Sequence, residues 1–209
     1  MKNLAQRITG SLALLTALII LTPNAGAGTP FTAGNIVVER MTVSGTASSA
    51  QLVEVVEYPP GGGTAAQTIS LPNAATRPTG NPYNLMDGGS TTSAGGLTRS
   101  ANGGMITLPG YNGIPGDLTI AASASATISR VIGAISLGGT ADTSRGGLNI
   151  ISGTAFRGVA STDGTQFWCS GGNGLWYYDS VPTLNQLGSQ NLRMAISTDR
   201  KSTRLNSSH

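Results

Sequence analysis

The side chains of this chain that could do chemistry are a group of aromatic rings and a few carboxylates. Trp168, Trp176, Tyr177 and Tyr178 lie close together in the sequence. Because neighbouring residues of a strand point to opposite faces, Trp176 and Tyr178 would share one face, on which a ligand such as a sugar ring could stack. The same rings could instead fill the space between packed sheets, which is an ordinary role of large aromatic residues.

The sequence contains only one histidine and one cysteine, so catalysis or metal binding that depends on these residues is not expected. The only histidine is His209 and the only cysteine is Cys169, which we expect to be a small buried strand residue. A Ser-His-Asp or Cys-His constellation needs an imidazole, and a zinc site needs a cluster of Cys and His. The sequence therefore predicts no catalytic residue, no metal and no cofactor. An enzyme would have to use carboxylates such as Asp163, Asp179 and Asp199.

The first residues have the order of a secretory signal peptide. Lys2 and Arg7 precede an apolar run of about ten residues, and small residues follow up to Ala27. A membrane-spanning helix needs about 20 apolar residues, so this run is too short. The pattern predicts a signal peptide over residues 1–27 with cleavage near Ala27. The protein would be secreted, periplasmic or at the cell surface, with no integral membrane span.

Charge is concentrated at the two ends of the chain. The whole sequence has a formal net charge of +3, but residues 28–199 hold seven arginines and all nine acidic residues, a net charge of −2. Binding to nucleic acid requires a basic stripe, so we expect no nucleic-acid partner. Residues 201–209, Lys-Ser-Thr-Arg-Leu-Asn-Ser-Ser-His, resemble a translated sequencing adapter. We therefore expect a non-native tail on the N-terminal fragment of a larger protein.

Between these ends, apolar and β-branched residues are grouped in short runs that are separated by Gly-, Pro- and Asn-rich turns. No sustained 3.6-residue periodicity occurs, so the predicted fold class is all-β. The expected strands are residues 35–41, 51–58, 67–71, 97–100, 105–108, 118–122, 126–137, 156–160, 166–170 and 175–178.

A hairpin motif recurs along the chain. Residues 97–108 align with residues 157–168 when Ser100 is set on Ser161, and a third copy begins at residue 192. Each copy is predicted to be a strand, a tight Ser-x-Asn/Asp-Gly turn and a second strand. Asn102 and Asp163 are interpreted as turn residues rather than as ligands of calcium or a sugar.

A second kind of hairpin alternates with the first, at residues 52–71, 130–143 and 175–187, where a strand, a turn and a shorter strand are expected. Two alternating hairpins make four-stranded units. This organisation predicts an incomplete β-propeller-like array of antiparallel four-stranded blades over residues 28–200. A β-sandwich and a β-solenoid are the alternatives.

Several segments also carry a family resemblance. Residues 31–38 (Phe-Thr-Ala-Gly-Asn-Ile-Val-Val), the Glu-Tyr-Pro turn at 57–59, and residues 97–100 and 160–164 resemble secreted bacterial β-propeller-like repeat proteins. The resemblance covers most of residues 31–199 and implies export and the fold, but no activity.

The function we expect first is that of an exported binding or interaction module for a protein or polysaccharide ligand. One alternative is a structural repeat region of a cell-surface protein. The other is a carboxylate-dependent extracellular hydrolase.

Overall fold

The computed structural model describes residues 27–42, 46, 48–88, 95–179 and 184–193. Their regular structure is β apart from one short 3-10 turn, so the expected all-β class is confirmed. In this part of the chain no helix has the length and apolar character needed to cross a membrane. The elements are β1 (Ile36–Thr42), β2 (Ala50–Tyr58), β3 (Gln67–Ser70), β4 (Met86–Gly88), β5 (Thr98–Arg99), β6 (Met105–Tyr111), η1 (Ile120–Ala122), β7 (Arg130–Ser136), β8 (Ala141–Leu148), β9 (Phe156–Ser161), β10 (Phe167–Gly171), β11 (Gly174–Tyr178) and β12 (Leu184–Gly188).

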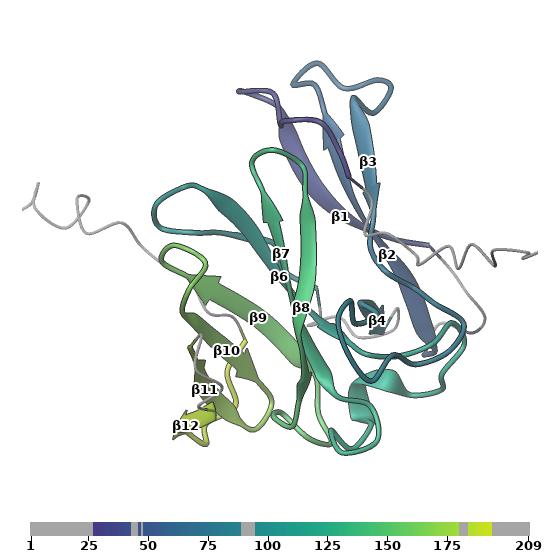
Figure 1. Cartoon of the computed structure of the whole chain (residues 1–209), viewed down its shortest axis with the longest axis vertical. Coiled ribbons are helices and arrows are strands. Elements are labelled where there is room, and N and C mark those ends of the chain that lie inside the picture. The colour runs from purple at the N-terminus through teal and green to yellow at the C-terminus, as the bar shows by residue number, and fades with distance from the viewer. Residues whose placement is uncertain (1–26, 43–45, 47, 89–94, 180–183, 194–209) are drawn as a thin grey trace, which may run out of the picture.

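The strands form two antiparallel sheets. The larger has eight strands in the order β1-β2-β4-β6-β7-β8, with β3 paired to β2 and β5 paired to β6, and the smaller has the order β12-β11-β10-β9. Within the larger sheet, β5 to β8 form a meander of four consecutive strands, and β9 to β12 repeat that pattern. Figure 1 shows the strands in three groups, β1 to β3, β6 to β8, and β9 to β12, with β6 to β8 in the middle.

Two hydrophobic cores lie on opposite sides of the middle group, because alternate side chains of its strands point to opposite faces. On β7, Val131 and Ile135 pack with Val55 of β2 in one core. Ile132 packs with Phe156 of β9 in the other. Because β6 and β7 are buried on both faces, the middle group connects the two cores.

The Ser-x-Asn/Asp-Gly turns lie at equivalent places in the two meanders. Ser100 directly follows β5 and Ser161 is the last residue of β9, so each begins the turn between the first and second strand of its meander. Gly103 and Gly164, three residues after each serine, have left-handed φ angles of 73° and 93°. Such angles suit glycine, so the two hairpins that the alignment predicted are confirmed. The third copy lies almost entirely outside the described residues.

The two turns also touch each other through the backbone. The amide of Ala101 donates to the Ser161 carbonyl at 3.1 Å, and the amide of Asn102 donates to the Thr162 carbonyl at 2.9 Å. Neighbouring hairpins of the repeat are therefore joined by main-chain hydrogen bonds.

The second kind of hairpin is also present, as β2–β3, β7–β8 and β11–β12. The expectation that its second strand is the shorter one is wrong for β11–β12, where each strand has five residues, and for β7–β8, because β8 has eight residues and β7 has seven. Register shifts along this pair let the longer strand accommodate the extra residue.

Some boundaries differ from the sequence prediction. The strand expected over residues 118–122 is wrong: Ile120–Ala122 is a 3-10 turn, entered through Thr119 with a left-handed φ of 51°. That angle is incompatible with an extended strand. The strand expected from residue 126 begins at Arg130, after a turn in which the amides of Thr127 and Ile128 donate to the Ala124 carbonyl. Strand β4 was not expected at all.

Candidate functional site

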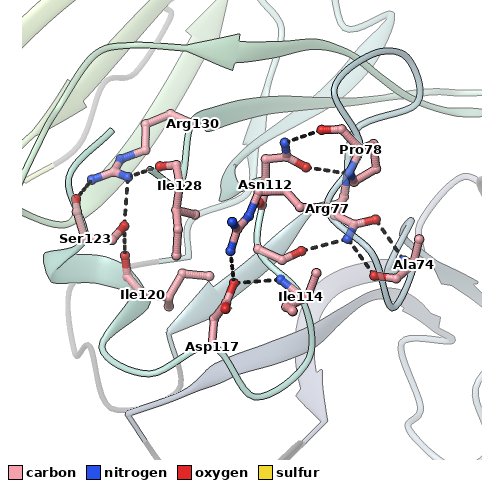
Figure 2. A network of polar contacts seen from close by, with 12 residues as sticks. Ala74, Arg77, Pro78, Asn112, Ile114, Asp117, Ile120, Ser123, Ile128 and Arg130 are labelled. Carbon is pink, nitrogen blue, oxygen red and sulfur yellow. Dashed lines mark hydrogen bonds and ion pairs between the residues drawn. The ribbon is translucent and has the colours of Figure 1, made fainter. Parts of the chain in front are cut away.

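A network of satisfied polar groups holds the loops at one end of the larger sheet (Figure 2). Arg77 forms an ion pair with Asp117 at 2.7 Å and donates to the Asn112 carbonyl at 2.9 Å. Asp117 in turn accepts from the backbone amide of Ile114 at 2.9 Å. Since these groups form hydrogen bonds and an ion pair with one another, the network has a structural role.

Arg130 is buried completely and is also satisfied. It donates to the carbonyls of Ile151 at 2.7 Å, Ile128 at 2.5 Å and Ser123 at 2.8 Å, and its guanidinium lies 4.8 Å from the centre of the Tyr111 ring. Burial lowers the pKa of Arg130 from its ordinary value. The carbonyls belong to two loop segments, residues 123–129 and 149–155, so this side chain fixes those loops and has no group left for a ligand.

The aromatic residues singled out in the sequence are divided between two faces. Trp176 and Tyr178 pack against the core beside β9 and β10, while Tyr177 contacts Trp168 on the other face, with ring centroids 5.5 Å apart. The predicted alternation is confirmed. Because Trp176 and Tyr178 contact the core, their placement agrees with rings that fill the space between sheets. A ligand-stacking role for these two residues stays a prediction.

The carboxylates considered for catalysis do not form a common site. Oδ1 of Asp163 accepts from the amide of Thr165 at 3.0 Å, just as Oδ1 of Asn102 accepts from the amide of Gly104 at 2.9 Å. Both side chains close their own turns, as expected. Asp179 follows β11, with no hydrogen bond to Asp163 within the described residues, and Asp199 lies outside those residues.

Cys169 is buried in β10 with no exposed surface, in agreement with the sequence prediction. Burial raises the pKa of its thiol, so the reactive thiolate is not populated at neutral pH.

A pocket of about 450 Å³ lies beside β1. Its walls are mostly apolar, with one cationic side chain and a few polar groups. The lining residues are Phe31, Thr32, Ala33, Gly34, Asn35, Val37, Leu97, Arg99, Ile106 and Leu137. Volume and lining both fall in the range of small-molecule sites.

Glu57 holds one wall of this pocket in place. One carboxylate oxygen accepts from the Thr32 amide and from Nδ2 of Asn35, both at 2.7 Å, and the other accepts from Nε2 of Gln67 at 2.6 Å. Burial alone would raise the pKa of Glu57, but these hydrogen bonds outweigh it and the pKa lies below its ordinary value. The loop before β1 is therefore fixed by a buried, ionised and fully hydrogen-bonded carboxylate.

Two other buried carboxyl groups have no such partners. Glu39 of β1 and Asp87 of β4 face one another across the backbone of Gly95: a methyl group built on Gly95 would lie 3.1 Å from Oδ2 of Asp87 and 3.1 and 3.2 Å from the two oxygens of Glu39. None of these three oxygens has a hydrogen-bond partner in the described part of the chain, and each is almost wholly buried. Oδ1 of Asp87 accepts only from the amide of the next residue, Gly88.

The electrostatics of this carboxyl pair are opposite to those of Glu57. Burial raises the pKa of Glu39 to about 7. Burial, and then the charge of Glu39, raise the pKa of Asp87 well above its ordinary value. A carboxyl group that titrates near neutral pH can exchange a proton or accept a cation, so this pair is a candidate site.

The pair lies close to the pocket in the structure. Val37, which lines the pocket, and Glu39 are on the same face of β1, roughly 7 Å apart along the strand. Gly95, which contacts both carboxyl groups, precedes the pocket residue Leu97 by two residues.

Comparison with protein-family models, with curated proteins and with solved structures gives no match to this chain. The site therefore has to be interpreted from its own geometry.

The sequence analysis did not single out Glu39 or Asp87. The signal for Glu39 was present, because it alternates with Val37 on the face of the strand that packs inward, where a charged side chain is unusual. No signal was present for Asp87, since β4 has only three residues and no pattern of its own.

Proposed function

We propose that this protein is an exported binding module, and that the pocket beside β1 binds a small amphipathic molecule with an apolar body and an anionic group. The observation that carries the proposal is the lining of the pocket: six apolar side chains surround one arginine, Arg99. An apolar wall with a single cation favours a ligand that matches both features.

Arg99 is held at the pocket by the hairpin in which it lies. Its Nε and Nη2 both donate to the Gly103 carbonyl at 3.2 Å. Nη1 makes no hydrogen bond within the described residues, so it can donate to an anion without breaking a contact that the hairpin needs. Arg99 also forms no ion pair there, so no carboxylate of the described chain competes with a ligand.

The proposal includes a propeller-like arrangement of the four-stranded units. Two consecutive meanders of four strands, with equivalent first turns, support it. An experimental structure tests this part: β5 to β8 should superpose on β9 to β12 after rotation about a central axis. Two sheets stacked face to face without such an axis would instead indicate a sandwich.

The anionic dye 8-anilinonaphthalene-1-sulfonate tests the pocket, because it combines an aromatic body with a sulfonate. We expect its fluorescence to rise with the full chain and most of that rise to be lost in Ala33→Trp, which fills the pocket from an exposed position. Arg99→Gln should weaken dye binding about tenfold, the equivalent of one charge-assisted hydrogen bond, while Arg99→Lys should keep part of the affinity.

A matched control comes from the outer face of the same strand. Ile36 is 55% exposed and does not line the pocket. Ile36→Ser should leave the dye signal unchanged. If Ile36→Ser lowers the signal and Ala33→Trp does not, the dye binds the outer face of β1 and the pocket is not the binding site.

A further inference from the structure

The carboxyl pair brings three oxygen atoms without hydrogen-bond partners in the described residues against the backbone of Gly95. Both oxygens of Glu39 and Oδ2 of Asp87 lie 3.1 to 3.2 Å from the position that a side chain on Gly95 would occupy. Because each oxygen lies at most 3.2 Å from the same position, no two of them are more than about 6.4 Å apart. A side chain at position 95 would crowd all three oxygens, and glycine avoids that contact.

Asp87 itself is the second reason to regard the pair as a site. Its side chain is 1% exposed, and its Oδ2 has no partner among the described residues although it faces Glu39. A buried polar atom without a partner destabilises the folded protein, and more strongly when it is charged. A folded protein can keep such a group when a bound ligand or a proton compensates for the missing hydrogen bond.

The two neighbouring arginines, Arg40 and Arg157, interact with groups other than the carboxyl pair. Arg40 follows Glu39 directly but is on the opposite face of β1, where it forms an ion pair with Glu54 at 2.8 Å. Arg157 donates through Nη1 to the side chain of Asn191 and to the Leu192 carbonyl, while its buried Nε has no partner in the described residues. Neither arginine forms an ion pair with Glu39 or Asp87.

We propose that Glu39 and Asp87 bind a divalent cation between them, and that Ca²⁺ fits the site better than Mg²⁺. The unpartnered atoms of the pair are carboxylate oxygens, which hard cations prefer. Ca²⁺ accepts a bidentate carboxylate and an irregular set of six to eight ligands, whereas Mg²⁺ demands a near-ideal octahedron. Water would supply the remaining ligands. The cation would neutralise both buried charges, so its binding and the folding of this region are coupled.

The competing interpretation is a proton shared by the two carboxyl groups, as occurs where like charges lie close together. The two interpretations differ in what stabilises the protein at alkaline pH. A metal site predicts stabilisation by CaCl₂, whereas a shared proton predicts stabilisation by acid alone.

The test is a thermal melt of the full chain at about pH 8, first in chelator and then in CaCl₂ or MgCl₂ at about 1 mM, a concentration at which weak Ca²⁺ sites fill. We expect CaCl₂ to raise Tm by several degrees and MgCl₂ to raise it less. Calorimetric titration with CaCl₂ should give one binding event per chain.

Glu39→Gln and Asp87→Asn should each lose the CaCl₂-dependent shift. Both variants remove a buried charge, so their melts in chelator should occur at or above the temperature of the unmodified chain, and loss of the shift cannot be explained by failure to fold. Glu54→Gln, on the outer face of the same strand pair, should keep the full shift. The proposal is overturned if CaCl₂ leaves Tm unchanged, or if the two site variants respond to CaCl₂ as the unmodified chain does.

Discussion

Glu57 and Glu39 lie on the same face of the β1–β2 pair, yet their surroundings shift the pKa values of the two carboxyl groups in opposite directions. Val37 is paired with Glu57 and Glu39 with Val55, so the two glutamates are diagonal neighbours. Glu57 accepts hydrogen bonds from two amide side chains and a backbone amide, and its pKa is lowered. Glu39 has no donor in the described residues, and its pKa is raised to about 7. The difference teaches that the supply of donors, rather than burial, decides whether a carboxylate stabilises this sheet.

The largest expected effect comes from removing the satisfied carboxylate. Glu57→Leu would leave the amide of Thr32 and the side-chain amides of Asn35 and Gln67 without their acceptor. We expect the free energy of unfolding to fall by about 2–4 kcal/mol, the cost of several unpaired donors. Urea denaturation measures it. A loss below about 1 kcal/mol would show that these donors find water instead, and the contrast with Glu39 would then disappear.

The next largest effect is expected at Glu39, where a substitution should raise the free energy of unfolding instead of lowering it. Because burial raises the pKa of Glu39 from 4.5 to about 7, the folded protein binds its proton more tightly than the unfolded chain does. Stability should therefore fall as pH rises from about 4.5 to about 7 in the absence of a cation. Glu39→Gln should remove this slope and raise stability by about 2–3 kcal/mol at pH near 8 in chelator.

The pH dependence of that gain is its own control. Below about pH 4 the Glu39 carboxyl is protonated in both states, so Glu39→Gln should have no effect there. A gain that is the same at both pH values would have to come from packing rather than charge.

A smaller loss is expected at the glycine between the carboxyl groups. Gly95 has a left-handed φ of 73°, which costs about 1–2 kcal/mol for a residue with a Cβ atom. Gly95→Ala should lower stability by this amount and should also reduce the response to CaCl₂, because the methyl group fills the space between Glu39 and Asp87. Gly34→Ala, with a φ of 90° and open space around it, controls for backbone strain alone.

The smallest effect is expected on the outer face of the same strand pair. Arg40 and Glu54 form an ion pair whose side chains are 46% and 22% exposed. Exposed pairs contribute about 0–1 kcal/mol, so Glu54→Gln should change the free energy of unfolding by less than about 0.5 kcal/mol. Added salt should abolish even this difference, whereas it should leave the Glu57→Leu loss almost intact.

Strands with a strong local pattern could be predicted from the sequence, and those held by pairing alone could not. Runs rich in Val and Ile predicted the positions of β1, β2 and β7 to within a few residues. Strand β8 contains Gly146 and Gly147 and has little β propensity, so its length depends on its pairing with β7. Strand β4 is positioned by its place between β2 and β6, which no local pattern encodes.

The candidate site was harder to predict than the fold. Its two carboxyl groups come from strands separated by more than forty residues, and they meet only because β2 pairs with β1 along one edge and with β4 along the other. The hairpin turns were predictable for the opposite reason, since Ser, Asn or Asp, and Gly at fixed spacing determine a turn locally.

The contact between the two repeat turns has a consequence for how such a chain can change over time. Ala101 and Asn102 reach Ser161 and Thr162 through amides and carbonyls, which every residue except proline possesses in full. Substitutions at these positions can therefore accumulate without altering how one hairpin sits on the next. Gly103 and Gly164 are constrained by their φ angles instead. Descendants of an ancestral hairpin could diverge until only the serine and the glycine remained in common, while their mutual placement stayed the same.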